Sequence, residues 1–337
     1  MEPVRADLIS RARAGDSEAF RALTDPHRRE LQVHCYRMLG SFQDAEDALQ
    51  DTMLAAWQGL AGFEARASIR TWLYRIATNR CLSTLRSVGR RPAKAWDNSR
   101  LELPEPSRLG EITWLEPFPD ALLDRAIDVP VGPEARYEQT ESISMAFVTA
   151  LQVLPPRQLA VLILRDVLGF RANEVAEMLD STVPSITSAL NRARVGLQQR
   201  LPIAEHRPAP APGSPAEDAI VEKFVRAYES GDIEALVTLL TDDAFSTMPP
   251  IPLEYHVRDA VARLCAAILR AGPGFDLVPT RANGQPAFGA YLRSASGNRP
   301  GTGLLLLTLS DDQIRGITRF DSSALPWFGL PPSLPSR

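Results

Sequence analysis

Apolar residues at helical spacing divide residues 166–197 into two short helices. The first predicted helix would bury Val175, Ala176 and Leu179, and the second repeats Ile186, Leu190, Ala193 and Leu197 every three or four positions. A polar turn at residues 180–182 separates them, and the Thr182 hydroxyl can cap the second helix. Pro184 falls in the first turn of that helix, where a missing N–H is tolerated. The pattern predicts a helix-turn-helix.

The outer face of the second predicted helix carries hydroxyls, an amide and arginines. No acidic residue occurs between residues 181 and 201. Short hydroxyls near a helix start can contact base edges, and arginines further along can contact phosphates. For this segment alone, an ordinary helical hairpin is the alternative. The face consists of Ser185, Thr187, Ser188, Asn191, Arg192 and Arg194.

Residues 44–57 predict an amphipathic helix with an acidic outer face. Asp44, Asp47 and Asp51 are spaced i, i+3 and i+7, with no basic partner among them. Repulsion among these carboxylates does not stabilise a helix, whereas a surface of unpaired negative charge suits the docking of a basic partner. A merely solvated face is the alternative. The expected buried side includes Ala45, Ala48, Leu49, Thr52, Leu54 and Trp57.

Residues 63–91 predict a loop followed by a long basic helix. Its expected inner stripe is Ile69, Trp72, Leu73, Ile76, Ala77, Cys81 and Leu85. Its outer face is basic and rich in hydrogen-bond donors, and it consists of Arg75, Asn79, Arg80, Ser83 and Arg86. Such a face suits single-stranded or melting DNA, because donors can hold the backbone while a loop binds an unstacked base.

The chain changes composition along its length. Residues 5–91 and 139–201 are helical by pattern, and residues 92–138 predict an acidic, proline-rich linker. Residues 202–216 form a proline-rich hinge, and residues 217–330 predict an α+β domain. Its expected helices are Glu217–Ser230, Ile233–Leu240 and Val257–Leu269, and its expected strands are Ala244–Met248, Phe275–Arg281, Ala287–Arg293, Gly303–Leu309 and Gln313–Phe320, with hairpin turns at Gly297-Asn298 and Asp311-Asp312.

Overall composition is that of a globular protein, and charge is unevenly distributed. The chain has 337 residues, 45% of them hydrophobic, and a net charge of −4. Residues 66–94 hold eight basic residues and no acidic one, whereas residues 95–140 hold four basic and ten acidic residues. A basic helix followed by an acidic connector favours a nucleic-acid partner for the first segment only.

Cysteine usage and hydropathy indicate the cytoplasm. Cys35, Cys81 and Cys265 are far apart and odd in number, which argues against a disulfide framework and against a zinc site. His34 and Cys35 with His27 nearby are expected to be core residues rather than metal ligands. No apolar run approaches a membrane span, and the N-terminus lacks the apolar core of an export signal. We expect no membrane association, metal or cofactor.

The acidic helix, the basic helix and the helix-turn-helix, in this order, resemble a bacterial sigma factor of the extracytoplasmic-function (ECF) group. The resemblance implies a σ2 domain over residues 14–91 and a σ4 domain over residues 141–201. It implies that the run DAEDALQDT docks on the β′ clamp helices of core RNA polymerase, with the β flap as a further partner. Ser83 stands where many relatives carry Asp, which leaves the exact −10 contacts open.

The resemblance assigns three sets of functional residues. The polymerase-binding set is Asp44, Glu46, Asp47, Gln50 and Asp51. The set that melts and reads the −10 promoter element is Arg66, Arg70, Trp72, Arg75, Asn79, Arg80, Ser83 and Arg86. The set that reads the −35 element is Thr182, Ser185, Thr187, Ser188, Asn191, Arg192 and Arg194.

The C-terminal region resembles SnoaL-like domains of the NTF2-like superfamily, which implies a cone of curved sheet and helices. The expected fold class is therefore multidomain, with all-α σ2 and σ4 followed by an α+β NTF2-like domain. Its acid and base candidates are Asp242, Asp243 and Asp276, with Tyr255 and His256 expected in a loop, and they form no convincing catalytic pair.

We therefore expect no catalytic residues, and a C-terminal domain that regulates the sigma factor in cis, with a small-molecule ligand left open. The alternative is a DNA-binding regulator fused to a SnoaL-like enzyme that converts a small molecule. Two aromatic segments, Trp327-Phe328 and Trp114–Phe118, are candidate docking surfaces or local core.

Overall fold

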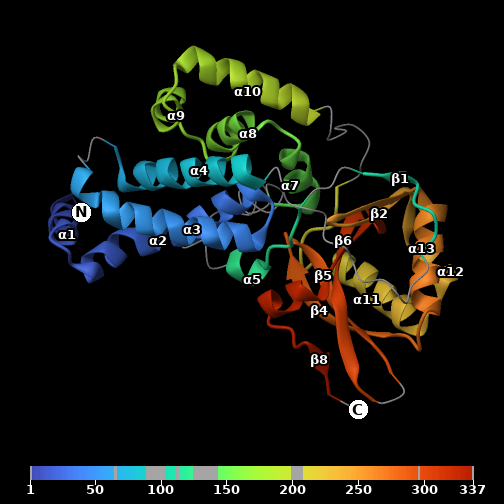
Figure 1. Cartoon of the computed structure of the whole chain (residues 1–337). Coiled ribbons are helices and arrows are strands. Elements are labelled where there is room, and N and C mark those ends of the chain that lie inside the picture. Colours follow the sequence, from blue (N-terminus) through green and yellow to red (C-terminus); the bar gives the residue numbers. More distant parts are fainter. Residues whose placement is uncertain are drawn as a thin grey trace. The chain divides into compact units, whose positions relative to one another are not determined.

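The computed structural model describes residues 2–63, 67–88, 103–110, 114–123, 143–198, 208–294 and 297–335. Contacts divide the chain into two units (Figure 1). The first unit comprises Met1–Arg91 and Leu122–Pro202, and the second comprises Pro92–Ala121 and Ile203–Arg337. The second unit thus includes residues from the segment between the two helical regions.

The N-terminal part of the first unit is a bundle of helices that lie beside one another. Its elements are α1 (Glu2–Arg13), α2 (Ser17–Leu39), α3 (Phe42–Gly59), the short 3₁₀ helix η1 (Leu60–Gly62) and α4 (Ile69–Val88). Asp16 and Ser41 cap α2 and α3 with side-chain oxygens. The core is formed where α2 packs against α3 and α4, and it includes Leu31, Tyr36, Leu73 and Ala77.

The remainder of the first unit contains the helix-turn-helix. Its elements are α7 (Met145–Gln152), α8 (Pro156–Leu162), the π-helical turn η3 (Ile163–Val167), α9 (Ala172–Met178) and α10 (Val183–Gln198). Val175 and Ile186 are fully buried, which confirms the predicted inner sides of both helices. The Thr182 hydroxyl accepts a hydrogen bond from the Ser185 backbone N–H, so the predicted cap is confirmed.

The second unit is a curved sheet with helices on one face. Its elements are β1 (Arg108–Leu109), α5 (Asp120–Leu123, at the boundary between the units), α11 (Pro215–Ser230), α12 (Ile233–Thr238), β2 (Leu240–Met248), β3 (Ile251–His256), α13 (Arg258–Arg270), β4 (Phe275–Ala282), β5 (Gln285–Leu292), β6 (Arg299–Ser310), β7 (Gln313–Phe320), η4 (Ser322–Phe328) and β8 (Ser333–Leu334). The strand order is β1-β3-β2-β7-β6-β5-β4, and only the β2–β7 pairing among these is parallel.

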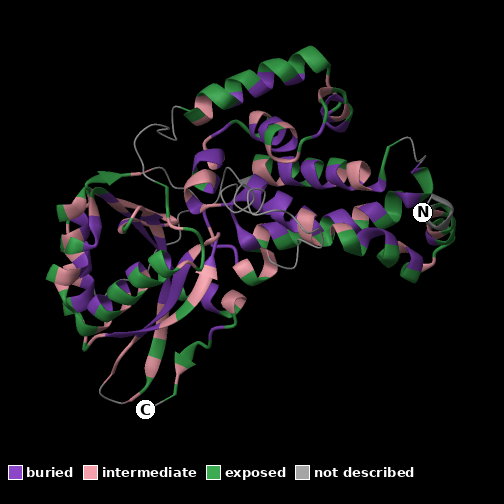
Figure 2. Ribbon diagram, turned by 180° about the vertical axis from the view of Figure 1, so that it is seen from behind, coloured by how far each residue is buried: buried purple, intermediate pink, exposed green. Residues whose placement is uncertain are grey.

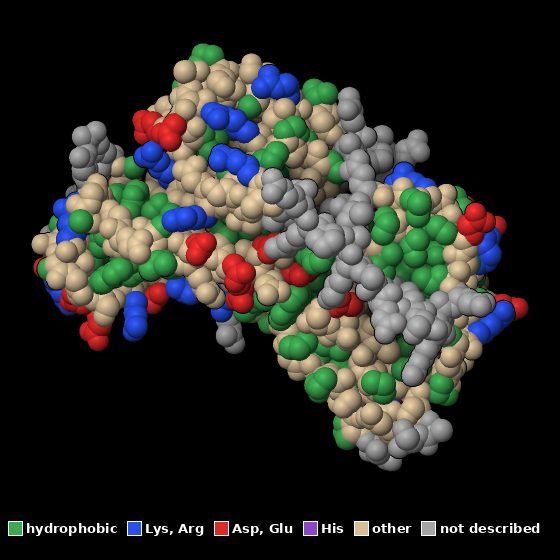
Figure 3. All heavy atoms as spheres, viewed as in Figure 1, with side chains coloured by type: hydrophobic (Ala, Val, Ile, Leu, Met, Phe, Trp, Pro, Cys, Tyr) green, Lys and Arg blue, Asp and Glu red, His purple; other side chains and the backbone are tan. Residues whose placement is uncertain are grey.

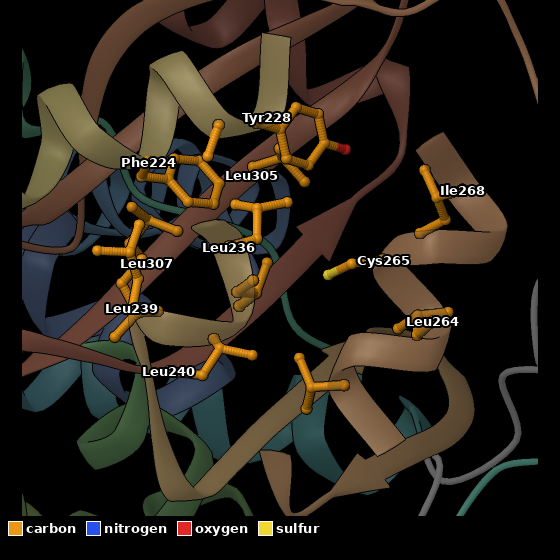
Figure 4. Packing of buried hydrophobic residues seen from close by; sticks show 14 of the residues in the cluster. Phe224, Tyr228, Leu236, Leu239, Leu240, Leu264, Cys265, Ile268, Leu305 and Leu307 are labelled. Carbon is orange, nitrogen blue, oxygen red and sulfur yellow. The ribbon is translucent and has the colours of Figure 1, made fainter. Parts of the chain in front are cut away.

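An apolar cluster fills the space between this sheet and its helices. Figure 4 shows side chains of α11, α12, α13 and β6 turned toward a common interior. Phe224, Leu264 and Leu307 are among the fully or almost fully buried members. The burial pattern follows the elements, with buried positions on the inner sides of helices and exposed ones outside (Figure 2).

Two details of the C-terminal sheet differ from the sequence-based expectation. Tyr255 and His256 lie in strand β3 rather than in a loop, so that expectation was wrong. The prolines at 250 and 252 disguised the strand, because proline is uncommon inside sheets. The turn between β4 and β5 is Asn283-Gly284, which was not among the predicted hairpin turns. Both residues have positive φ angles (56° and 74°), as a two-residue hairpin turn requires.

Candidate polymerase and nucleic-acid interfaces

The acidic face of α3 is exposed. Glu46, Asp47, Gln50 and Asp51 lie on the surface, and Asp44 is half-buried in the first turn. Glu46 accepts a hydrogen bond from the Gln32 amide at 3.3 Å, so this carboxylate is not fully available. Four of the five predicted polymerase-binding side chains thus share one accessible surface.

The same surface continues into an apolar end that the sequence analysis placed in the core. Leu54 is 56% exposed and Trp57 is 37% exposed, so their predicted burial was wrong. Trp57 meets Phe20 edge-on, with ring centroids 5.0 Å apart. The spacing pattern failed here because α3 packs only through the side that carries Ala45, Ala48, Leu49 and Thr52. An acidic face ending in exposed apolar side chains is typical of a protein-binding surface.

Arg70 lies in the packing of α4 rather than on its outer face. Its guanidinium lies over the rings of Tyr74 and Phe170, at 4.8 Å and 5.1 Å from their centroids. It also donates to Glu30 at 2.9 Å. Burial opposes the charge of Glu30, but hydrogen bonds from His27 and Arg70 outweigh it and lower the pKa of that carboxyl. Arg70 therefore has a structural role here.

The other predicted −10 residues separate into two groups. Trp72 is half-buried against Phe63, with ring centroids 4.9 Å apart. Arg66 lies outside the described residues. The five residues of the predicted outer face are all exposed, namely Arg75, Asn79, Arg80, Ser83 and Arg86. They form one surface of α4, and Figure 3 shows Lys and Arg side chains over the helical part of the molecule.

Two members of that surface contact the helix-turn-helix. The Arg75 guanidinium lies 3.2 Å from an Asp180 carboxylate oxygen. The Asn79 amide donates to the backbone carbonyl of Met178 at 3.4 Å. Both acceptors belong to the end of α9 and the turn before α10, within the first unit. These contacts could not be predicted from local sequence patterns, because about 100 residues separate the partners along the chain.

All seven predicted −35 residues are exposed on or beside α10. They differ in how far they are already engaged. Arg194 forms a two-point ion pair with Asp166, with both nitrogen–oxygen distances at 2.8 Å. The hydrogen bonds that Arg194 donates to Asp166 raise the pKa of Arg194. The Thr187 hydroxyl donates to the Val183 carbonyl of its own helix at 3.1 Å. Arg192, by contrast, is exposed, and among the described residues it forms no ion pair of this kind.

The acid and base candidates of the second unit are engaged in ion pairs. Asp242 pairs with Arg258, and Asp243 pairs with Arg315. Asp276 is 6% exposed and accepts from two arginines, Arg293 and Arg299, at 3.0 Å and 2.8 Å. Burial opposes ionisation of Asp276, but the two hydrogen bonds outweigh it and lower its pKa. Each of these carboxylates faces an arginine, an arrangement that suits structure better than proton transfer.

The remaining candidates also have structural partners. The Tyr255 hydroxyl donates to the Pro104 carbonyl at 2.9 Å, and His256 lies 2.9 Å from a Glu254 oxygen. Trp327 and Phe328 are half-buried in η4. Within the described ranges, no group of three or more His, Cys, Asp or Glu side chains could hold a metal ion, and no helix has the length and apolar character needed to cross a membrane.

The described residues from 103 to 121, which we call the strap, are built into the second unit. At one edge of the sheet, β1 pairs antiparallel with β3, and Arg108 forms an ion pair with Glu254. The Ser107 hydroxyl accepts from the His256 backbone N–H at 3.0 Å. The strap therefore adds a short strand to an edge that β3 would otherwise leave open.

The strap also reaches the opposite edge of the sheet. The Phe118 N–H donates to the Asn283 side chain at 2.8 Å, and the Asn283 N–H donates back to the Phe118 carbonyl at 2.9 Å. Pro119 forms an isolated bridge with Ala282 at the end of β4. Leu115 is 5% exposed and Phe118 fully buried. The Trp114–Phe118 segment was a candidate docking surface or local core, and its apolar residues Leu115 and Phe118 are part of the local core.

Comparisons with known proteins match the two helical regions of the chain. The Sigma-70 region 2 family model matches residues 23–91, and the Sigma-70, region 4 model matches residues 144–197. The chain is 41% identical to the ECF RNA polymerase sigma factor SigG of Mycobacterium tuberculosis, over 96% of this chain and 86% of SigG. It is 31% identical to SigM of the same species, over 59% of this chain and 86% of SigM.

Among solved structures, the sigma factor SigJ of Mycobacterium tuberculosis matches 94% of this chain and 100% of its own, with a TM-score of 0.60. At 19% identity this likeness shows a shared fold alone. The expected fold class, helical σ2 and σ4 regions followed by an α+β domain, is confirmed.

Proposed function

We propose that the C-terminal domain regulates the activity of this chain, which belongs to the ECF group of RNA polymerase sigma factors. The regulation acts within the same chain. Proteins of this family bind core RNA polymerase and promoter DNA. Residues 217–330 then have a regulatory role and no enzymatic activity. The strap is the observation that carries it.

We assign the contacts of the sigma factor to the surfaces described above. The exposed polar face of α3, with Asp47 and Asp51, binds the β′ clamp helices of core polymerase. The outer face of α4 binds the −10 element, and the outer face of α10 binds the −35 element. The σ4 region also contacts the β flap. Exposure of these side chains supports the assignment, since a side chain must be accessible to bind a partner.

The strap gives the domain a physical means of regulation. It is part of the segment that joins σ2 to σ4, and its ordered contacts are with the C-terminal sheet. A segment held on that sheet cannot at the same time follow a different path along polymerase. Any partner that needs the linker elsewhere must therefore compete with the domain for it. Because the domain and the linker are on one chain, the contact between them does not depend on protein concentration.

A transcription assay with core polymerase tests this proposal. It compares the full chain, a chain ending at Pro202, and the full-length variant Phe118→Ser, which weakens the strap. We expect the truncated chain and the Phe118→Ser variant to change promoter activity in the same direction. Leu109→Ser is the matched control, because Leu109 lies in the same strap and is 72% exposed. Equal transcription by all chains, across promoters and salt concentrations, would reject regulation in cis.

The non-catalytic assignment rests on the ion pairs of the carboxylates. Asp242, Asp243 and Asp276 each face an arginine, and the interior of the cone is lined by apolar side chains (Figure 4). The test is incubation of the full chain with small lipophilic carbonyl compounds. Turnover that is lost on replacing one of these aspartates would establish the enzyme alternative instead.

A small-molecule ligand of the C-terminal domain would act on the same competition. A ligand that prefers the strap-bound form would hold the linker on the domain, and one that prefers the other form would release it. Such a ligand is proposed only as a modulator of the regulation described here.

A further inference from the structure

The side chain of Arg281, near the end of β4, joins two segments of the second unit that are far apart in the sequence. Its Nη1 donates to Glu217 Oε2 at 2.7 Å, and its Nη2 donates to Glu217 Oε1 at 3.2 Å. Its Nε lies 3.5 Å from a carboxylate oxygen of Asp120. Glu217 lies in the first turn of α11, and Asp120 lies at the end of the strap. One guanidinium therefore connects the strap with the start of α11.

Backbone N–H groups fix the same two carboxylates. Asp120 Oδ1 accepts from the Gly284 N–H of the β4–β5 turn at 2.8 Å. Glu217 Oε2 accepts from the Gly213 N–H of the proline-rich hinge at 2.7 Å. The Asp120 and Glu217 side chains are only 14% and 4% exposed. Their attraction to Arg281 is therefore less screened by water than that of a surface pair.

The hairpin that carries Arg281 also supports the strap. Pro119 forms a bridge with Ala282, and Phe118 exchanges two hydrogen bonds with Asn283. Removing the strap would take away these partners of the residues that follow Arg281 and would expose the guanidinium further. An ion pair weakens as water reaches it, because Coulomb attraction falls as the dielectric constant rises.

The described residues of the hinge are built onto the second unit. The Pro208 carbonyl accepts from the Asp311 N–H at 3.2 Å, and the Ser214 N–H donates to the Ala211 carbonyl at 3.0 Å. The Ser214 hydroxyl accepts from the Glu217 N–H at 3.3 Å and caps α11. The hinge is thus attached both to the β6–β7 turn and, through Glu217, to Arg281.

The whole σ4 region lies between the strap and the hinge in the sequence, so these attachments limit its reach. Residues 122–202 belong to the first unit. Pro208 is 10 residues after Gln198, the last residue of α10, and a segment of that length spans at most about 33–36 Å. If the hinge were free as far as Pro215, the first residue of α11, the segment would have 17 residues and span at most about 56–61 Å.

We propose that Arg281 is a positioning residue that clamps the strap and the hinge together on the second unit, so that displacing the strap also loosens the hinge and lengthens the tether of σ4. This inference rests on the proposed regulation in cis and names the side chain that couples its attachment points. A partner that draws the linker away would thereby extend the reach of σ4. A longer reach suits the simultaneous binding of two separate promoter elements.

The test is hydrogen exchange of the full chain, measured by mass spectrometry in peptides that cover residues 114–121 of the strap and 209–216 of the hinge. Arg281→Ala removes the cation that both carboxylates share, and breaking a buried pair in this way is costly. We expect exchange to become about tenfold faster in both segments. Faster exchange in only one segment, or in neither, would overturn the clamp.

Arg315→Ala is the matched control. Arg315 forms an ion pair with Asp243 on the same sheet, and neither residue belongs to the strap or the hinge. Its removal should leave exchange in both segments unchanged. A peptide from the centre of β6 reports general destabilisation of the domain. If Arg281→Ala accelerates exchange equally in that peptide, the clamp is rejected.

Phe118→Ser tests whether release of the strap reaches the hinge. We expect faster exchange in the hinge peptide than in the β6 peptide, and no further increase in the hinge when Phe118→Ser is combined with Arg281→Ala. Leu109→Ser, at an exposed position of the same strap, should leave the hinge unchanged. A hinge that exchanges equally in Phe118→Ser and Leu109→Ser would reject the coupling.

Core RNA polymerase separates this inference from the proposed function. When it is added to the wild-type chain, exchange should become faster in the strap and in the hinge together. Faster exchange in the strap alone would reject the clamp and leave the competition for the linker in place. No change in the strap would reject that competition, and the Arg281→Ala variant would still decide the clamp.

Discussion

Replacement of Phe118 by alanine should destabilise the C-terminal domain, although Phe118 precedes that domain by about a hundred residues in the sequence. Phe118 is fully buried, and its backbone exchanges two hydrogen bonds with Asn283. Truncation of a buried Phe to Ala costs about 3–5 kcal/mol, because it removes apolar burial and leaves a cavity. A domain stability of roughly 5–15 kcal/mol would lose a large fraction of its value.

The measurement is urea denaturation of the full chain, followed by hydrogen exchange of peptides from β4 and β5. With a slope of about 1–3 kcal/mol per molar urea, a loss of about 3–5 kcal/mol should lower the midpoint of the C-terminal transition by roughly 1–5 M. Leu109→Ala is the control in the same strap, because 72% of Leu109 is already exposed. Substitution of such an exposed side chain should lower the free energy of unfolding by less than about 0.5 kcal/mol. If Phe118→Ala behaves like Leu109→Ala, the strap is not part of the folded domain.

Three further predictions concern the helical unit. Charge reversal of Asp47 and Asp51 to lysine should abolish assembly with core polymerase without lowering thermal stability, and normal assembly in a pull-down would reject that surface. If Arg192 contacts a phosphate, Arg192→Ala should reduce the slope of log DNA affinity against log salt concentration by about 0.9. Arg194→Ala should act mainly by breaking the ion pair with Asp166, so that neutralising Asp166 should have the same effect. Burial lowers the pKa of His34 to about 3, so below pH 6.5 His34 binds a proton in the unfolded chain but not in the folded chain. The free energy of unfolding should therefore fall by up to about 1.4 kcal/mol per pH unit between pH 6.5 and 3. The His34→Gln variant should show a flatter dependence of stability on pH.

Local patterns were sufficient for the helix-turn-helix. Apolar spacing predicted its buried positions, and a single hydroxyl at Thr182 marked the start of α10. Both signals are local, because a helix presents residues three and four apart on the same side. The same reasoning was wrong for Leu54 and Trp57. A spacing pattern identifies which residues share a face, but only the neighbouring helices determine how far along that face the packing extends.

Contacts between distant segments could not be predicted from the sequence. The segment containing Arg108 and Phe118 has the acidic, proline-rich composition of a linker, yet it pairs with both edges of a sheet. The ion pair between Arg194 and Asp166 joins residues 28 positions apart, and nothing in the spacing distinguishes Arg194 from Arg192. Strand β3 was not predicted, because Pro250 precedes it, Pro252 lies within it, and proline is uncommon in sheets. Its partner β2 is the preceding strand in the chain.

The strap makes the coupling between linker and domain reciprocal. An exposed sheet edge carries unpaired N–H and C=O groups, and here residues from the linker pair with part of the β3 edge and with the end of β4. Pulling the strap away would therefore expose both backbone edges and the space that Phe118 fills. Whatever displaces the linker must supply that free energy, and whatever stabilises the domain must by linkage strengthen its hold on the linker. A C-terminal domain attached only through its hinge would impose no such condition on the segment between σ2 and σ4.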